Sequence, residues 1–111
     1  MKLITAVVTP SEFEAVKKAL DIFGITGLTI TEVFQRDLTS GREQVYRGQR
    51  FHVDLVPHVR MELVIADRDT ADLVRILTKL TSPRRCQENI WLTPVETLTR
   101  IRTGERGTDA L

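Results

Sequence analysis

The sequence predicts one α+β domain, and three observations on the 111-residue chain carry this prediction. Short apolar runs rich in β-branched residues indicate strands, whereas apolar residues repeated every three or four positions indicate two helices. The order strand–helix–strand occurs twice, and a long polar segment separates the two halves. Two such halves favour a ferredoxin-like βαββαβ sheet with both helices on one face.

The first half begins with residues 3–8, a short apolar run that indicates a buried strand. Ser11 is followed three positions later by Glu14, which is a capping-box pattern. A helix is therefore predicted to begin at Ser11 and to end at Gly24, since glycine favours the left-handed conformation that stops a helix. Residues 28–34 are rich in β-branched side chains and indicate the second strand.

The polar segment covers residues 35–50 and shows no periodicity. A loop this long in a small domain is usually functional or disordered. Strand character returns at residues 51–56, and Pro57 is predicted to interrupt it. Residues 59–65 alternate and predict another strand. Its two sides are Met61, Leu63 and Ile65 on one, and Arg60, Glu62 and Val64 on the other.

A second helix and a strand at residues 90–92 lead to the C-terminal tail, which contains Arg100 and Arg102. In an extended strand, residues two positions apart point to the same side. The two arginines are therefore predicted to project in parallel, with Ile101 turned the opposite way into packing. Two guanidinium groups on one face suit a phosphate, because each offers several fixed donors and a permanent charge.

Composition excludes several classes of function. The net charge is +1, from 16 basic and 15 acidic residues. The chain therefore lacks the excess of positive charge that general nucleic-acid or membrane binding requires. Cys86 is the single cysteine, so no internal disulfide and no cysteine-rich metal site are expected. No run is long enough for a membrane span. We expect a cytoplasmic, soluble protein with neither catalytic residues nor metal ligands.

An antiparallel sheet with both helices on one side leaves its other face uncovered. Val8 and Val64 are expected on this face among charged side chains. A face of mixed character on so small a domain favours packing against further copies of the chain.

Five segments carry a resemblance to a known family. They are residues 1–8 followed by Pro10, residues 24–33 (GITGLTITEV), residues 46–48 (YRG), residues 53–57 (VDLVP) and residues 94–107, which end in RIRTGERG. Together they resemble the PII signal-transduction proteins from end to end. The resemblance implies one domain over residues 1–111, forming a homotrimer around a sheet-lined core. It also implies a T-loop at about 35–54, a B-loop at about 82–89 and a C-terminal loop at about 100–111.

The resemblance further implies that ADP, AMP or ATP binds in clefts between subunits and that the T-loop docks on a regulated protein. By matching position, Thr29 and the backbone at Val64 resemble adenine-reading groups, and Gly27 and Glu62 resemble residues that line the base and ribose. The phosphate residues that it implies are Arg100 and Arg102 from the neighbouring subunit, with Arg84 and Arg85 near the B-loop as further candidates.

Departures from the family pattern limit what the resemblance implies. Residues 35–39 (QRDLT) replace the Gly-x-Gly-Arg-Gln that handles Mg-ATP and 2-oxoglutarate, so 2-oxoglutarate sensing is not expected. Residues 86–89 (CQEN) replace the glycine-rich Gly-Asp-Gly-Lys of the B-loop, which favours ligands with fewer phosphates than ATP. Phe51 stands where many members carry a uridylylated tyrosine, and a phenyl ring cannot take that modification.

His58 replaces the lysine that grips 2-oxoglutarate in the family, and Arg60 follows two positions on. An imidazole beside a guanidinium suits a small anion such as bicarbonate. Tyr46, Arg47 and Phe51 are the T-loop residues expected to contact the regulated partner.

Three alternatives stay open. The altered loops resemble a branch of the family linked to carboxysomes and bicarbonate. Its competitors are another branch associated with bicarbonate transport and a regulator of ammonium uptake or glutamine synthesis in nitrogen metabolism. An RNA-binding module shares the ferredoxin-like topology, although few aromatic residues are available for base stacking. An enzyme is the third class, but the sequence shows no recognisable nucleophile–base pair, metal-ligand cluster or pair of catalytic carboxylates.

Overall fold

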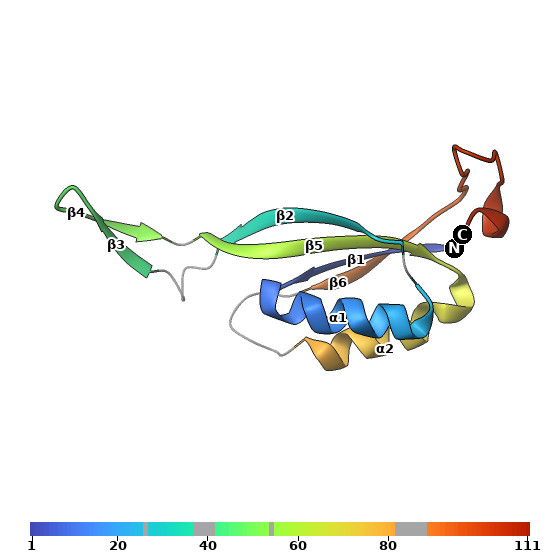
Figure 1. Cartoon of the computed structure of the whole chain (residues 1–111), viewed down its shortest axis with the longest axis horizontal. Helices are drawn as coiled ribbons and strands as arrows, with labels where there is room; N and C mark the ends of the chain where they lie inside the picture. The colour runs from blue at the N-terminus through green and yellow to red at the C-terminus, as the bar shows by residue number, and fades with distance from the viewer. Residues whose placement is uncertain (26, 37–41, 54, 82–88) are drawn as a thin grey trace.

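The computed structural model describes residues 1–25, 27–36, 42–53, 55–81 and 89–111 (Figure 1). Its elements are β1 (Lys2–Val8), α1 (Pro10–Phe23), β2 (Thr29–Arg36), β3 (Arg42–Tyr46), β4 (Gln49–Val53), β5 (Leu55–Ile65), α2 (Thr70–Leu80) and β6 (Ile90–Pro94), with short 3-10 turns η1 (Asp67–Asp69) and η2 (Gly107–Ala110). Neither α-helix in this part of the chain is both long and apolar enough to cross a membrane.

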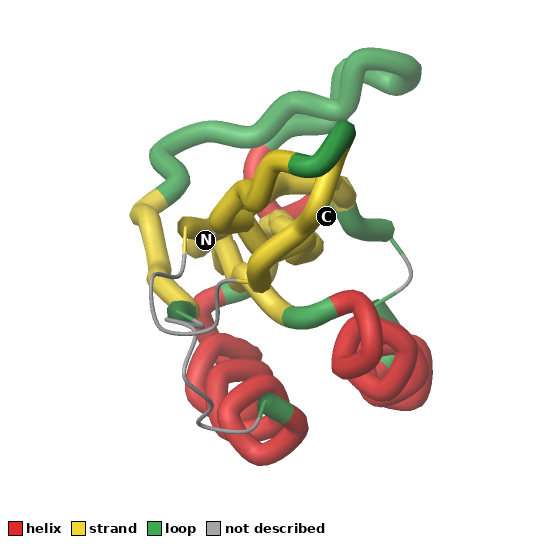
Figure 2. The backbone as a smooth tube through the Cα atoms, turned by 90° about the vertical axis from the view of Figure 1, so that its left-hand side faces the viewer, coloured by secondary structure: helices red, strands yellow, loops and turns green. Residues whose placement is uncertain are grey.

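Four strands form one antiparallel sheet in the order β2-β5-β1-β6. Both helices lie on the same face of this sheet, as Figures 1 and 2 show. Strand order and helix placement confirm the predicted ferredoxin-like α+β fold. The core between helices and sheet consists of Ile4, Ala6, Val8, Val16, Leu20, Met61, Leu63, Ile65, Leu73 and Leu77.

The alternation predicted for β5 is confirmed, because Met61, Leu63 and Ile65 are all buried beneath the helices. The prediction for Val8 is wrong. Val8 is opposite Val59 in the ladder, and both face the helices. Successive side chains alternate, so β1 presents its odd-numbered residues to the uncovered face. We call this uncovered side the open face. In register across β5, β1 and β6, it carries Leu3, Thr5, Val7, Arg60, Glu62, Val64, Trp91 and Thr93.

Helix α1 begins earlier than predicted. Its N-cap is Thr9, whose Oγ1 accepts a hydrogen bond from the backbone nitrogen of Glu12 at 3.3 Å. Thr9 and Glu12 have the same spacing as Ser11 and Glu14, so the sequence contains two overlapping capping patterns. Pro10 decides between them, because proline suits the first position of a helix. The predicted end at Gly24 is confirmed, with φ at 101°.

This cap gives a measurable prediction. Thr9→Ala is expected to lower the free energy of unfolding by about 1 kcal/mol, since it removes the side-chain acceptor of the Glu12 N–H and leaves that donor only the carbonyl of residue 9. Ser11→Ala removes only the 3.1 Å contact between the Ser11 hydroxyl and Thr9 Oγ1 and keeps the bond to Glu12, so it is expected to stay within about 0.5 kcal/mol of the parent. Urea unfolding followed by circular dichroism compares the two. An equal loss in both variants would contradict the assignment of Thr9 as the cap.

The polar segment is not irregular throughout, which corrects the expectation for residues 35–50. Strands β3 and β4 pair as a two-stranded hairpin that projects from the body (Figure 1). Its two-residue turn is Arg47-Gly48, with φ values of 51° and 76°. Two successive positive φ angles are what a tight hairpin turn needs to match the twist of its strands.

Strand β5 also differs from prediction, because Pro57 does not interrupt it. The strand runs through Pro57, which is opposite Phe34 of β2. On the other side, β1 pairs with β5 only from Val59 onward. Pro57 therefore sits where one flank of β5 has no partner strand, and a missing N–H costs nothing on an open flank.

Candidate ligand-binding site

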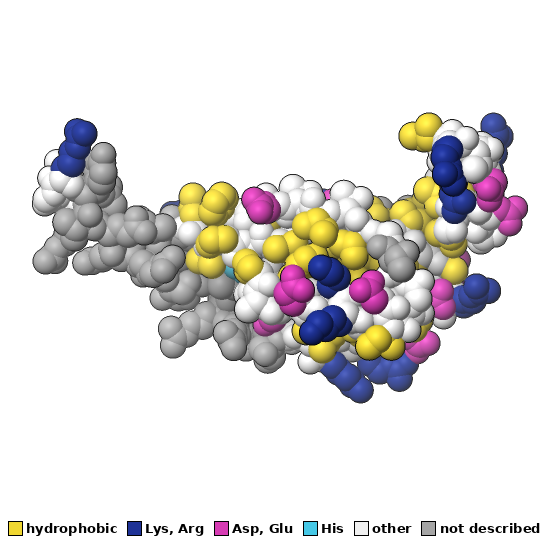
Figure 3. Space-filling model, viewed as in Figure 1, with side chains coloured by type: hydrophobic (Ala, Val, Ile, Leu, Met, Phe, Trp, Pro, Cys, Tyr) yellow, Lys and Arg dark blue, Asp and Glu magenta, His cyan; other side chains and the backbone are white. Residues whose placement is uncertain are grey.

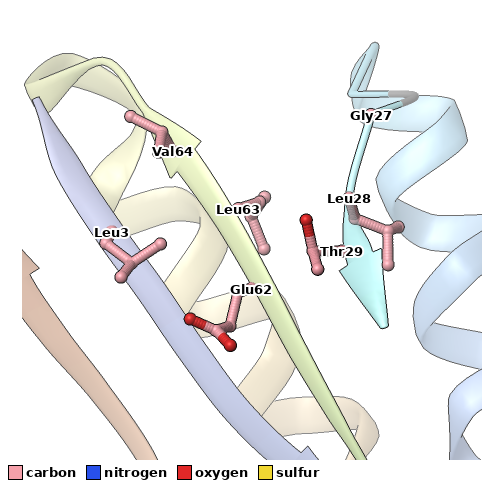
Figure 4. A pocket seen from close by; sticks show the side chains of 7 residues that line it. All are labelled: Leu3, Gly27, Leu28, Thr29, Glu62, Leu63 and Val64. Atoms are coloured by element: carbon pink, nitrogen blue, oxygen red, sulfur yellow. The ribbon is translucent and has the colours of Figure 1, made fainter. Parts of the chain in front are cut away.

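A hollow of about 440 Å³ lies at the end of the sheet where β2 begins and β5 ends. Its lining is Leu3, Gly27, Leu28, Thr29, Glu62, Leu63 and Val64 (Figure 4). Four of these, Gly27, Thr29, Glu62 and Val64, are the residues that the sequence predicted for the base and ribose of a nucleotide. The volume falls within the usual range of about 300–1,000 Å³ for small-molecule sites.

The strand register explains why these residues meet. Thr29 is opposite Glu62 in the first pair of the β2–β5 ladder, so residues 63–65 of β5 have no partner strand on the β2 side. Leu3 is opposite Val64 on the other flank and contributes an apolar wall. Alternate residues of a strand direct their N–H and C=O groups to each flank. The unpaired flank of residues 63–65 therefore offers backbone groups that can read the edge of a planar base.

The polar side chains of the hollow differ in their partners. Glu62 is partly buried, and its Oε1 lies 3.2 Å from Nε of Arg60. The guanidinium carbon of Arg60 also lies 5.7 Å from the ring centroid of Trp91. Arg60 thus balances the charge of a carboxylate that would otherwise repel an anionic ligand. The hydroxyl of Thr29 has no protein partner in the described part of the chain, which leaves it available to a ligand.

A second hollow, of about 380 Å³, adjoins the first and shares Gly27 and Val64 with it. The remaining residues of its lining are Gly24, Ile25, Ile65, Ala66, Arg68, Asp69 and Leu111. Leu111 belongs to the C-terminal segment, so the last turn of the chain lies beside the candidate site. Figure 1 shows both ends of the chain near this end of the sheet.

The predicted strand around Arg100 and Arg102 is wrong. Residues 98–107 close into a loop in which Arg100 N donates to the carbonyl of Glu105 at 2.9 Å, and Gly107 N donates to that of Leu98 at 2.9 Å. Gly104 permits this reversal through its φ of 75°. Ile101 is consequently 100% exposed instead of packed.

The two arginines therefore do not line either hollow of their own chain as far as the described residues define them. The guanidinium of Arg100 donates to the carbonyl of Ala110 and to the α-carboxylate of Leu111. That of Arg102 is exposed and forms no ion pair or hydrogen bond within the described ranges. An arginine of this kind is available to an anion on a neighbouring molecule.

His58 is 2% exposed, on the side of β5 that faces away from the helices. Its Nδ1 lies 3.1 Å from the carbonyl oxygen of Val56. A carbonyl only accepts, so Nδ1 carries the hydrogen and donates it. In the neutral ring Nε2 is then an acceptor, and it has no partner among the described residues. No hydrogen bond or ion pair joins His58 to Arg60 there, because Arg60 is directed to Glu62 and Trp91.

Several predicted site residues fall outside what the structure describes. They are residues 82–88 of the predicted B-loop, which include Arg84 and Arg85, residues 37–41 and 54 of the predicted T-loop, and the side chains of Tyr46 and Phe51. Arg47 is described and lies exposed at the tip of the hairpin. The described residues include no cluster of three potential His, Cys, Asp or Glu metal ligands.

Two residues beside the site were missed at the level of sequence. Leu3 lines the first hollow and Trp91 holds Arg60 in place. Both depend on the register between β1 and its two neighbours, which puts Trp91, Thr5 and Glu62 in one row. Period-two alternation in β1, taken together with that in β5, is the signal that would have indicated Leu3.

Comparison with known proteins places the chain in a family. The family model described as "Nitrogen regulatory protein P-II" matches residues 1–105. The chain belongs to the P-II family. A relative named nitrogen regulatory protein P-II from Azospirillum brasilense is 37% identical over 112 residues, with all of both chains covered. Nitrogen regulatory protein P-II 1 from Methanothermobacter thermautotrophicus is 37% identical over 115 residues, covering 100% of this chain and 97% of the relative.

A third P-II relative, from Pasteurella multocida, is 34% identical over 112 residues with full coverage of both chains. The resemblance recognised in the segments of the sequence is therefore confirmed along the whole chain. Membership of the P-II family makes this protein a relative of signalling regulators.

Proposed function

We propose that this P-II protein is a homotrimeric regulator that binds adenine nucleotides in clefts between its subunits and controls a partner protein through the hairpin β3–β4. The observation that carries the proposal is the meeting of Gly27, Thr29, Glu62 and Val64 around one hollow. An apolar wall, an available hydroxyl and unpaired strand backbone suit a purine, whose faces are apolar and whose edge carries donors and acceptors.

The cationic half of the proposed site comes from a second copy of the chain. Arg102 is exposed and available, while the hollow of its own chain contains no arginine in the part nearest Thr29. Leu3, Val64 and Trp91 on the open face supply the apolar surface for contact between copies. Light scattering coupled to size-exclusion chromatography checks the trimer directly.

ADP and AMP are the proposed ligands, with ATP bound no more tightly than ADP. Residues 86–89 (CQEN) carry no glycine, and a glycine-poor loop holds fewer backbone N–H groups close to a phosphate chain. The open face argues against the RNA-binding alternative, because modules of that kind stack bases on several aromatic rings of the sheet. Trp91 is the sole Phe, Tyr or Trp side chain on the described part of this face, and Arg60 already lies over its ring.

The regulated process is proposed to be inorganic-carbon metabolism, with bicarbonate as the effector at His58. The Nε2 of His58 is buried and has no partner among the described residues. In the neutral form of the ring it would accept from a ligand that carries an O–H donor, which bicarbonate has and a fully ionised dicarboxylate lacks. Nitrogen metabolism is the second candidate, because the relatives are named nitrogen regulatory proteins.

Calorimetric titration of the purified chain with AMP, ADP and ATP tests these proposals. We expect ADP to bind at micromolar concentration or below, and bicarbonate to change its affinity in the wild type and not in His58→Ala. Tight, Mg²⁺-dependent synergy between ATP and 2-oxoglutarate would instead assign the protein to nitrogen sensing. Absence of binding by all three nucleotides would overturn the nucleotide proposal.

A further inference from the structure

The guanidinium group of Arg100 is occupied by its own chain. Nη2 donates to the carbonyl oxygen of Ala110 at 3.2 Å and to an α-carboxylate oxygen of Leu111 at 3.0 Å. Nη1 lies 3.7 Å from Oε1 of Glu105. Both terminal nitrogens of the group therefore face acceptors of the C-terminal segment.

Backbone hydrogen bonds stabilise the same conformation of residues 100–111. Gly104 N donates to the carbonyl of Arg100 at 2.7 Å, and Arg100 N donates to that of Glu105 at 2.9 Å. Leu111 N donates to the carbonyl of Thr108 at 3.2 Å, which orders the end of the segment. Arg102 is only two residues away, yet its guanidinium has no partner in the described ranges. The C-terminal segment therefore engages one arginine of the pair and not the other.

The same segment reaches the candidate site. Leu111 lines the second hollow together with Arg68, and that hollow shares Gly27 and Val64 with the first. In the space-filling view, cationic and acidic side chains gather around the C-terminal segment at this end of the molecule (Figure 3). Contacts that engage Arg100 therefore also hold the last residue beside the hollow.

We infer that residues 105–111 form a C-terminal latch that competes with ligand phosphate for Arg100. The inference rests on the proposed function, since it concerns an arginine of the proposed phosphate pair. Arginine donates hydrogen bonds and accepts none. A phosphate that binds both terminal nitrogens competes with the carboxylates of Glu105 and Leu111 and with the carbonyl of Ala110. This competition lowers the affinity for the nucleotide. A nucleotide that does bind releases the segment that carries Leu111 from Arg100.

Glu105→Gln tests the latch with the whole chain intact. It removes the charge that faces Arg100 and keeps the shape, so we expect ADP to bind about two- to threefold more tightly. Asp109→Asn is the matched control, because it removes the same charge from the same segment and Asp109 makes no ion pair in the described structure. We expect the control to change ADP affinity by less than about 1.5-fold.

A chain that ends at Thr108 lacks the carbonyl of Ala110 and the carboxylate of Leu111, and it is expected to bind ADP about three- to tenfold more tightly. In the Arg100→Ala background, the same shortening is expected to give no gain. Hydrogen exchange supplies a readout independent of affinity. The amide of Leu111 is expected to exchange faster in wild-type protein when ADP is added.

The outcomes separate the latch from the function on which it rests. If the wild type binds ADP and neither Glu105→Gln nor the shortened chain binds it more tightly, the latch is overturned and the nucleotide proposal stands. If neither the wild type nor the shortened chain takes up any adenylate, the proposed function and the latch both fail.

Discussion

Replacing Gly27 with leucine is expected to weaken ADP binding on the order of ten- to hundredfold while the protein stays folded. Gly27 borders both hollows, and its φ is not in the left-handed region. A Cβ added there meets no atom within 4 Å, so the backbone tolerates a side chain. The branched end of leucine, however, takes up space needed by the ligand, and overpacking costs roughly 1–3 kcal/mol.

Gly27→Ala is the control for this prediction, because a single methyl group leaves most of the hollow open. We expect it to weaken binding by no more than about threefold. Circular dichroism and the urea midpoint establish that both variants are folded, and calorimetry with ADP measures the affinities. A folded Gly27→Leu protein with wild-type affinity would show that the ligand binds elsewhere.

Replacing Arg102 with alanine is expected to weaken ADP binding about tenfold or more and to leave adenosine binding unchanged. A hydrogen bond to a charged group contributes about 1.5–3 kcal/mol, and Arg102 makes no ion pair within the described chain that would offset its loss. The dependence on phosphate is the diagnostic part, since adenosine lacks the group that the arginine is proposed to hold.

Arg106→Ala serves as the matched control, because Arg106 lies exposed in the same loop and carries the same charge. Removing the charge of Arg106 is expected to change ADP affinity by less than about twofold, through its long-range electrostatic effect alone. Competition titration with ADP, AMP and adenosine compares the three proteins. Equal losses in Arg102→Ala and Arg106→Ala would contradict a specific phosphate contact.

The sequence predicted those parts of the fold that follow from local periodicity. Alternation in β5 identified Met61, Leu63 and Ile65 as core residues because a strand buried on one side repeats every two positions. The start of α1 was displaced because Thr9 and Ser11 both satisfy one capping pattern. Val8 was assigned to the wrong face because apolar character alone does not give the parity of a strand.

Features that depend on backbone conformation or pairing were less predictable. The hairpin was missed because β3 lacks apolar alternation, although residues 51–53 of β4 lay within the predicted strand 51–56. Its identifying feature is the positive φ at Arg47 and Gly48. The tail was assigned to a strand because spacing says nothing about the reversal at Gly104. The residues of the hollow came from resemblance, whereas Leu3 and Trp91 required the register of three strands.

Strand β5 joins two parts of the molecule that a regulator must connect. Its 11 residues extend from Leu55, next to the hairpin, to Ile65, a distance of about 36 Å at the rise of an extended strand. Glu62 and Val64 near one end border the hollow. In the proposed regulator, one continuous strand therefore leads from the candidate ligand site to Leu55 at the base of the hairpin, with no other element in between.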